Sequence, residues 1–116
     1  MNQHFLTIEQ FDQLLKNWHG KDIQIQKIEM DDVDHIQLQL EQITYAKDLR
    51  RNMDDYVSRY TMQLNGDGQI LTDSHYQPLP TDMFEIPLQD TALYEYDGEQ
   101  FLISTDRGVY KIQLGS

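Results

Sequence analysis

The densest group of potential metal ligands in the chain is a run of carboxylates ending in an imidazole, formed by Asp31, Asp32, Asp34 and His35. Carboxylate oxygens supplied by a loop are the ligands that hard cations such as Ca²⁺ prefer. The spacing does not match an EF-hand loop, however, and aspartates are common in β-turns because they hydrogen-bond to nearby backbone. We therefore keep these residues as a candidate metal site but favour a solvated turn.

Local motifs for other chemistry are missing from the sequence. The four histidines have neither H-x-x-x-H nor H-E-x-x-H spacing, and no serine lies in a G-x-S-x-G elbow. There is no cysteine, no P-loop and no G-x-G-x-x-G. The sequence consequently predicts no catalytic residue and no cofactor. An enzyme whose site is assembled from distant Asp, Glu and His residues remains one alternative.

The charge of the chain is strongly acidic and unevenly distributed. The 116 residues include 20 acidic and 9 basic side chains, which gives a formal net charge of -11. Residues 65–99 contain many acids and no lysine or arginine. Because nucleic acids and anionic membranes recruit clustered basic residues, neither is expected to be a direct partner. The charge favours a basic protein as the partner.

Aromatic residues lie within the same acidic stretch and suggest a contact surface. Tyrosine is common at protein interfaces because its ring supplies contact area while its hydroxyl stays in water. The predicted partner-binding residues are Tyr76, Tyr94, Glu95, Tyr96, Asp97 and Glu99. The preferred function is a small, non-enzymatic protein-interaction module. A curved sheet or barrel that binds a small molecule is the other alternative.

Residues from about 7 to 18 are predicted to form a helix. Thr7 and Gln10 have the spacing of a capping box, in which each side chain hydrogen-bonds to the backbone of the other residue. Ile8, Phe11 and Leu15 then recur with the helical period and define one apolar face. Gly20 follows as a plausible stop.

From about residue 22 to residue 114 the apolar period changes to two, which predicts about seven or eight short antiparallel strands. Asn65-Gly66 and Asp97-Gly98 are typical of tight hairpin turns. Residues 46–55 are polar and are expected to be a connection. In the first hairpin we expect Met30 to lie opposite Ile36, with both strands changing face at a bulge.

An edge strand is expected between Phe84 and Leu88, because Pro87 lacks the N–H that an inner strand would use. An exposed edge can pair with a second copy of the chain, so a homodimer through this strand is one expectation. Glutamine occurs 14 times, mostly at polar positions of the predicted strands. We interpret these glutamines as a neutral, solvated surface.

The predicted fold class is α+β and mainly β: one N-terminal helix followed by antiparallel strands that form a strongly curved sheet or a small barrel. The length predicts a single domain over residues 1–116. No apolar run reaches the length of a membrane span, and the N-terminus does not resemble a signal peptide. Together with the lack of cysteine, these features predict a cytoplasmic protein, and a bacterial source suits its size.

Overall fold

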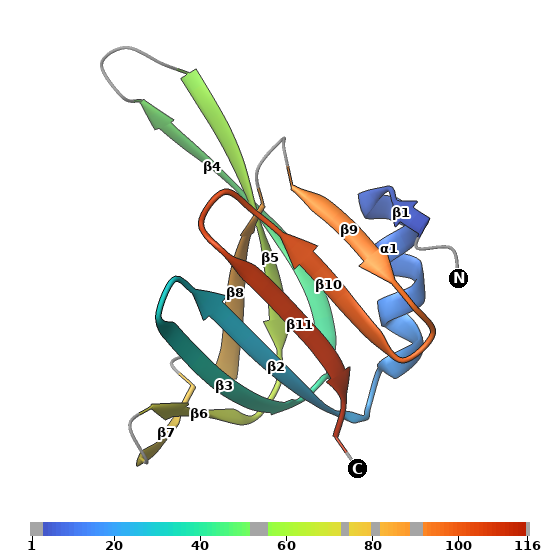
Figure 1. The fold of residues 1–116 in the computed structure, drawn as a ribbon, viewed down its shortest axis with the longest axis vertical. Coiled ribbons are helices and arrows are strands. Elements are labelled where there is room, and N and C mark those ends of the chain that lie inside the picture. Colours follow the sequence, from blue (N-terminus) through green and yellow to red (C-terminus); the bar gives the residue numbers. More distant parts are fainter. Residues whose placement is uncertain (1–3, 52–55, 73–74, 80–81, 89–91, 116) are drawn as a thin grey trace.

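The computed structural model describes residues 4–51, 56–72, 75–79, 82–88 and 92–115. Within them the chain forms one α-helix, one 3-10 turn and eleven strands (Figure 1). Their bounds are β1 His4–Leu6, α1 Ile8–Leu15, a 3-10 turn Lys16–Trp18, β2 Asp22–Glu29, β3 Asp32–Gln39, β4 Gln42–Arg51, β5 Tyr56–Asn65, β6 Gly68–Thr72, β7 His75–Pro78, β8 Met83–Leu88, β9 Leu93–Tyr96, β10 Gln100–Ser104 and β11 Val109–Leu114.

The helix begins as predicted, directly after Thr7. The Gln10 backbone N–H donates to the Thr7 hydroxyl at 3.1 Å, and the Gln10 side-chain oxygen accepts the Thr7 N–H at 2.9 Å. Both hydrogen bonds of the capping box are therefore present. Phe11 and Leu15 are buried on the apolar face, and Trp18 is buried in the 3-10 turn that ends the helical segment. The prediction of a helix over residues 7–18 is confirmed.

The described strands form two sheets. The larger has the order β1-β9-β10-β11-β2-β3-β6-β7, and the smaller has the order β4-β5-β8. A mainly β fold with a helix near its N-terminus is confirmed, but the eleven strands exceed the seven or eight expected, and β1 precedes the helix. The larger sheet is not closed, because β1 and β7 are its two edges. The barrel option is therefore not confirmed.

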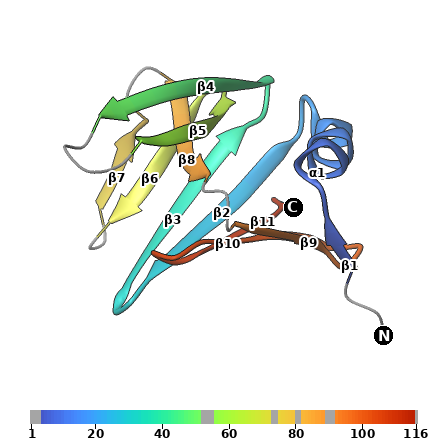
Figure 2. The same cartoon turned by 90° about the horizontal axis from the view of Figure 1, so that it is seen from above.

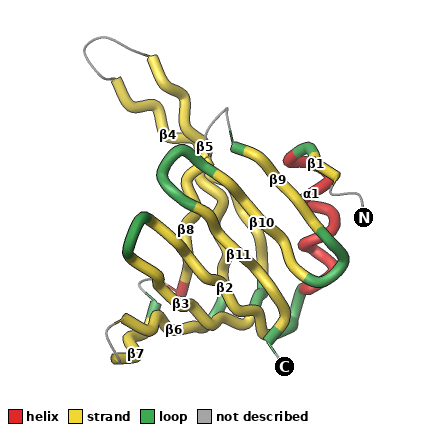
Figure 3. The backbone as a smooth tube through the Cα atoms, in the orientation of Figure 1, coloured by secondary structure: helices red, strands yellow, loops and turns green. Residues whose placement is uncertain are grey.

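Two local predictions were wrong. Residues 46–51, expected in a connection, belong to β4, which with β5 extends beyond the larger sheet (Figures 1 and 3). Asn65-Gly66 is not a hairpin turn: β5 pairs with β4 and β8, whereas β6 pairs with β3 and β7. The chain passes from one sheet to the other at Gly66, where a Cβ would collide with the Gln39 carbonyl oxygen.

The first hairpin has a different register from the one expected. Ile25 lies opposite Ile36, not Met30, and pairing continues without a shift to the two-residue turn at residues 30–31. Both strands therefore keep one face toward the core throughout. Ile28 and Val33, which lie opposite each other, point away from the core instead of changing face at a bulge. The predicted edge position of β8, with Pro87, is confirmed.

The core lies on one side of the larger sheet. The helix and the smaller sheet both lie on that side (Figure 2), and the buried apolar side chains form one cluster. Phe101 on β10 is at its centre. Its ring centroid is 4.9 Å from that of Phe11 and 4.8 Å from that of Trp18, and Tyr96 stacks on it at 4.2 Å. This aromatic group joins the helix to the larger sheet.

Among the described residues, no helix has the combination of length and apolar character that crossing a bilayer requires.

Phe101→Ala should lower the free energy of unfolding by about 3–5 kcal/mol, because it removes a fully buried ring and leaves a cavity. Phe5→Ala is the matched control, since that ring is 62% exposed and should contribute far less. Urea denaturation followed by tryptophan fluorescence measures both values. Equal losses for the two variants would contradict the assignment of the core.

Candidate functional site

A groove of about 790 Å³ lies between the helix and strands from both sheets. We call it the tyrosine groove. Its wall on one side is α1, and the facing wall comes from β4, β5, β8 and β9. It is lined by Ile8, Glu9, Asp12, Gln13, Lys16, Tyr45, Tyr60, Leu88, Ala92 and Tyr94. The groove exists only because the helix, the smaller sheet and one end of the larger sheet meet there.

The helical wall is polar because Glu9, Asp12, Gln13 and Lys16 recur at the spacing that places side chains on one helix face. Asp12 forms an ion pair with Lys16, with 2.8 Å between the Asp12 carboxylate and Lys16 Nζ. Glu9 is exposed and forms no ion pair with another described residue. The wall therefore offers one carboxylate that is neutralised locally and one that is free to meet a ligand.

Tyrosines form most of the facing wall. The Tyr45 hydroxyl donates a hydrogen bond to Asp12 Oδ1 at 2.7 Å, which links β4 to the helix. Tyr60 lies on the neighbouring strand β5, and its side chain is 45% exposed. Tyr94 on β9 packs against Phe11, with ring centroids 5.4 Å apart. Tyr45 and Tyr94 are thus fixed by contacts with the helix, and both Tyr45 and Tyr60 are partly exposed, at 41% and 45%.

The Tyr60 ring already attracts a cation. Lys47 lies on β4 opposite Tyr60 in the strand pairing, and its Nζ is 5.8 Å from the Tyr60 ring centroid. At that distance an ammonium group is attracted to the negative face of an aromatic ring. The Tyr60 ring is therefore placed to bind an ammonium group, as it does that of Lys47.

Two tyrosines of the groove, Tyr45 and Tyr94, remain neutral phenols at physiological pH because their pKa values are raised. Burial raises the pKa of Tyr45, and the hydrogen bond to the Asp12 carboxylate raises it further. Burial, together with the nearby Glu9 carboxylate, also raises the pKa of Tyr94. A neutral phenol is a hydrogen-bond donor and not a base or nucleophile.

The structure does not bring the predicted partner-binding residues together. Tyr94 lines the tyrosine groove, but Tyr96 packs on Phe101 in the core. Asp97 accepts backbone hydrogen bonds from residues 99 and 100 at 2.9 Å each, which lower its pKa and stabilise the turn. Tyr76 is 58% exposed, but it lies on β7 at the opposite edge of the sheet from β9.

The remaining predicted partner-binding residues are also separated from the groove. Glu95 points to the face of the larger sheet away from the core, since its neighbours Tyr94 and Tyr96 pack against the core. Glu99 is exposed in the β9–β10 turn. The acids of residues 65–99 accordingly do not share one side: Asp67 precedes β6, near one end of the larger sheet, and Glu99 follows β9, near the other. Asp73 and Asp90 lie outside the described residues.

The candidate metal residues lie in and after the turn between β2 and β3. Asp31 is in the turn, and Asp32, Asp34 and His35 are on β3. Successive side chains of a strand point to opposite faces, so Asp34 and His35 diverge. Among the described residues, no group of three acidic or histidine side chains is placed to hold a metal ion.

The groove was not predicted from the sequence. Of its three tyrosines, only Tyr94 was singled out from the sequence. The spacing of Glu9, Asp12, Gln13 and Lys16 was the available signal, because it marks a polar helix face. That signal cannot reveal which strands lie opposite the helix.

Comparison with known proteins identifies the family. A family described as YmzB-like protein matches residues 1–116. The chain belongs to the YmzB-like family. It is 31% identical over 114 residues to the uncharacterized protein YmzB of Bacillus subtilis (strain 168), an alignment covering 93% of this chain and 95% of the relative. No solved structure matches. The family has a bacterial member, and its name conveys no reaction, ligand or partner.

Asp12→Asn should lower the pKa of Tyr45 toward the ordinary value of 10.0, because it removes the negative charge that accepts the hydrogen bond of the neutral phenol. An alkaline titration of phenolate absorbance measures this change, and Tyr45→Phe identifies the contribution of Tyr45. Since the pKa of Tyr45 is raised in the folded protein, its contribution to the free energy of unfolding is complete below about pH 10. That contribution is lost as the pH rises through the pKa of the folded state. Identical titrations of wild type and Asp12→Asn would contradict the hydrogen bond.

Proposed function

We propose that this protein is an interaction module that binds a basic partner protein through the tyrosine groove. The observation that carries the proposal is the combination of a partly exposed aromatic ring, Tyr60, with the free carboxylate of Glu9 in one groove. A lysine or arginine side chain has an apolar stem and a cationic end. The stem would lie along Leu88 and the rings, and the cation would meet Glu9.

The charge of the whole chain supports the same class of partner. A net charge of -11 attracts a basic protein over distances longer than any contact and raises its association rate. The contact between Lys47 and the Tyr60 ring supports the local chemistry, because an ammonium group already lies over this ring although Lys47 itself does not line the groove. A partner cation would replace or join Lys47 there.

A small molecule is the second candidate occupant, and the size of the groove favours it. The volume of about 790 Å³ lies in the range of small-molecule sites. A ligand with a cationic group and an apolar body would use the same ring and carboxylate as a basic side chain. Native mass spectrometry of the protein purified from bacterial cells would reveal a retained small molecule and would then favour this candidate.

Capture from a Bacillus lysate on immobilised protein should recover a basic protein. The captured protein is then purified and its dissociation constant is measured by calorimetry. Tyr60→Leu and Glu9→Gln should each weaken binding by about tenfold, the equivalent of losing one cation–π or charged contact. Salt at about 0.5 M should also weaken binding, because it screens exposed charges.

Glu85→Gln is the matched control for charge. Glu85 is exposed on β8 and does not line the groove. Glu85→Gln therefore changes the net charge by the same amount as Glu9→Gln but leaves the groove intact. Equal weakening by both substitutions would assign binding to net charge and not to the groove. A captured partner that is not basic, or an affinity unaffected by salt, would contradict the proposal.

A further inference from the structure

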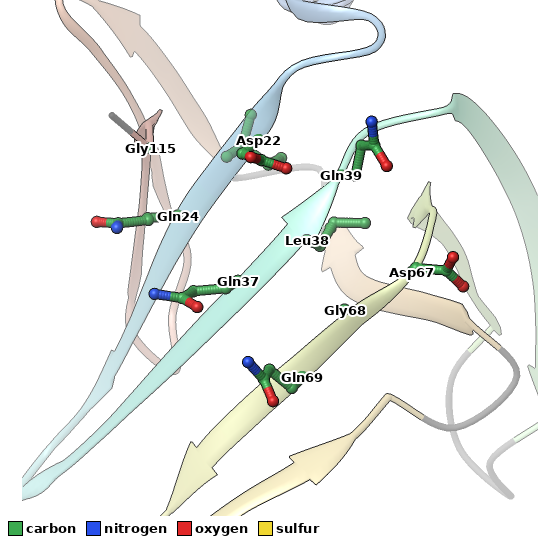
Figure 4. A pocket seen from close by; sticks show the side chains of 10 residues that line it. Asp22, Gln24, Gln37, Leu38, Gln39, Asp67, Gly68, Gln69 and Gly115 are labelled. Carbon is green, nitrogen blue, oxygen red and sulfur yellow. The ribbon is translucent and has the colours of Figure 1, made fainter.

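A continuous row of glutamines crosses the larger sheet on its outer face, which we define as the face away from the core. Gln100 lies opposite Gln113, Gln113 opposite Gln24, Gln24 opposite Gln37, and Gln37 opposite Gln69. The row therefore spans β10, β11, β2, β3 and β6, roughly 19 Å at the usual strand spacing. Figure 4 shows Gln24, Gln37 and Gln69 leaving three adjacent strands toward the same side.

The amides of this glutamine row have unused hydrogen-bonding capacity. None of the five side-chain amides is hydrogen-bonded to another described residue. Hollows of about 460 and 550 Å³ lie along the row, and Gln24 and Gln37 line both of them. Each amide can donate two hydrogen bonds and accept others. The row thus presents a series of amide hydrogen-bond donors and acceptors that face water in the isolated chain.

The outer face also differs from the rest of the molecule in charge. Among the described strand residues that point to this face, the charged side chains are Asp22, Glu95 and Lys111, with a net charge of -1, whereas the chain carries -11. The face becomes apolar only further along the strands, past the neighbouring positions Lys111, Gln26 and His35. Val33 is 45% exposed, Leu93 49% and Phe5 62%. Few charges and exposed apolar side chains are typical of the centre of a protein interface.

We infer that the outer face binds a second copy of this chain, sheet against sheet. Two molecules of charge -11 repel each other, and this face is where they can approach with little local repulsion. Glutamine both donates and accepts hydrogen bonds, so the row is complementary to itself, as a two-fold interface requires. Val109, Ile28 and Val33 lie on the same face, four residues along their strands from the row, and would be covered by the same contact.

The area of the face fits this occupant. The eight strands cover roughly 700 Å² in projection at the usual strand spacing and rise per residue. Each partner in a stable interface contributes about 800 Å² of accessible surface, which is comparable. A basic partner would instead be drawn to the more acidic remainder of the molecule. The homodimer predicted through the edge strand β8 is a different arrangement, and the experiment distinguishes the two.

The test is sedimentation velocity of the full chain from micromolar to millimolar concentration at about 0.15 M salt. The wild type should form a dimer. The double variant Gln24→Glu/Gln37→Glu should raise its dissociation constant at least tenfold, because the added carboxylates face each other across the interface. The control Gln42→Glu/Gln77→Glu adds the same charge elsewhere: Gln42 is on β4, and Gln77 lies opposite the inward-facing Ile70. Circular dichroism checks that both variants are folded.

Cross-linking provides a readout that does not depend on the charged variants. The chain has no cysteine, so Gln37→Cys introduces one reactive thiol on the outer face. A bismaleimide that spans about 10 Å, the spacing of packed sheets, should link two copies. Gln42→Cys should remain monomeric on the same gel. A wild type that stays monomeric, a dimer unaffected by the row variant, or equal weakening by the control would each overturn the inference.

Discussion

The contact between Phe101 and the helix is the constraint on which the rest of the structure depends. The Phe101 ring meets Phe11 and Trp18 from the helical segment and Tyr96 from the adjacent strand, and it is fully buried. It fixes the helix against one end of the larger sheet. Only with the helix there can Asp12 accept the hydrogen bond of Tyr45, which lies 33 residues away in the chain. The tyrosine groove therefore follows from a core contact.

Local features of this fold were predictable, and distant pairings were not. The capping box at Thr7 needs only neighbouring residues, and both of its hydrogen bonds form. Asn65-Gly66 has the chemistry of a hairpin turn, yet the chain changes sheets there, because the neighbours of β5 and β6 are far away in sequence. Tyr45 and Tyr60 could not be assigned to a groove, because their approach to the helix depends on which strands lie opposite it. The pairing expected for Met30 was wrong because its apolar side chain implied a position in the strand, whereas Met30 is exposed in the turn.

The structure separates two kinds of surface on a small acidic molecule. The tyrosine groove combines Glu9 with an accessible ring. It belongs to a protein whose own negative net charge attracts cations. The outer face carries the glutamine row and few charges. A charged partner would thus use the helix, the smaller sheet and β9, whereas a second copy would use mainly β10, β11, β2, β3 and β6 of the larger sheet. The helix and the smaller sheet lie on the side of the larger sheet away from the outer face (Figure 2), so the two proposed contacts do not overlap.

The central claim, that the tyrosine groove receives a cationic side chain, is tested most directly by nuclear magnetic resonance. A short peptide of alternating arginine and leucine is titrated into the nitrogen-labelled protein, and the backbone amide shifts are followed. The account predicts that the largest changes cluster around Glu9, Tyr60 and Tyr94 and saturate together. Changes confined to the outer face around Gln24 and Gln37, or scattered evenly over exposed carboxylates, would contradict it.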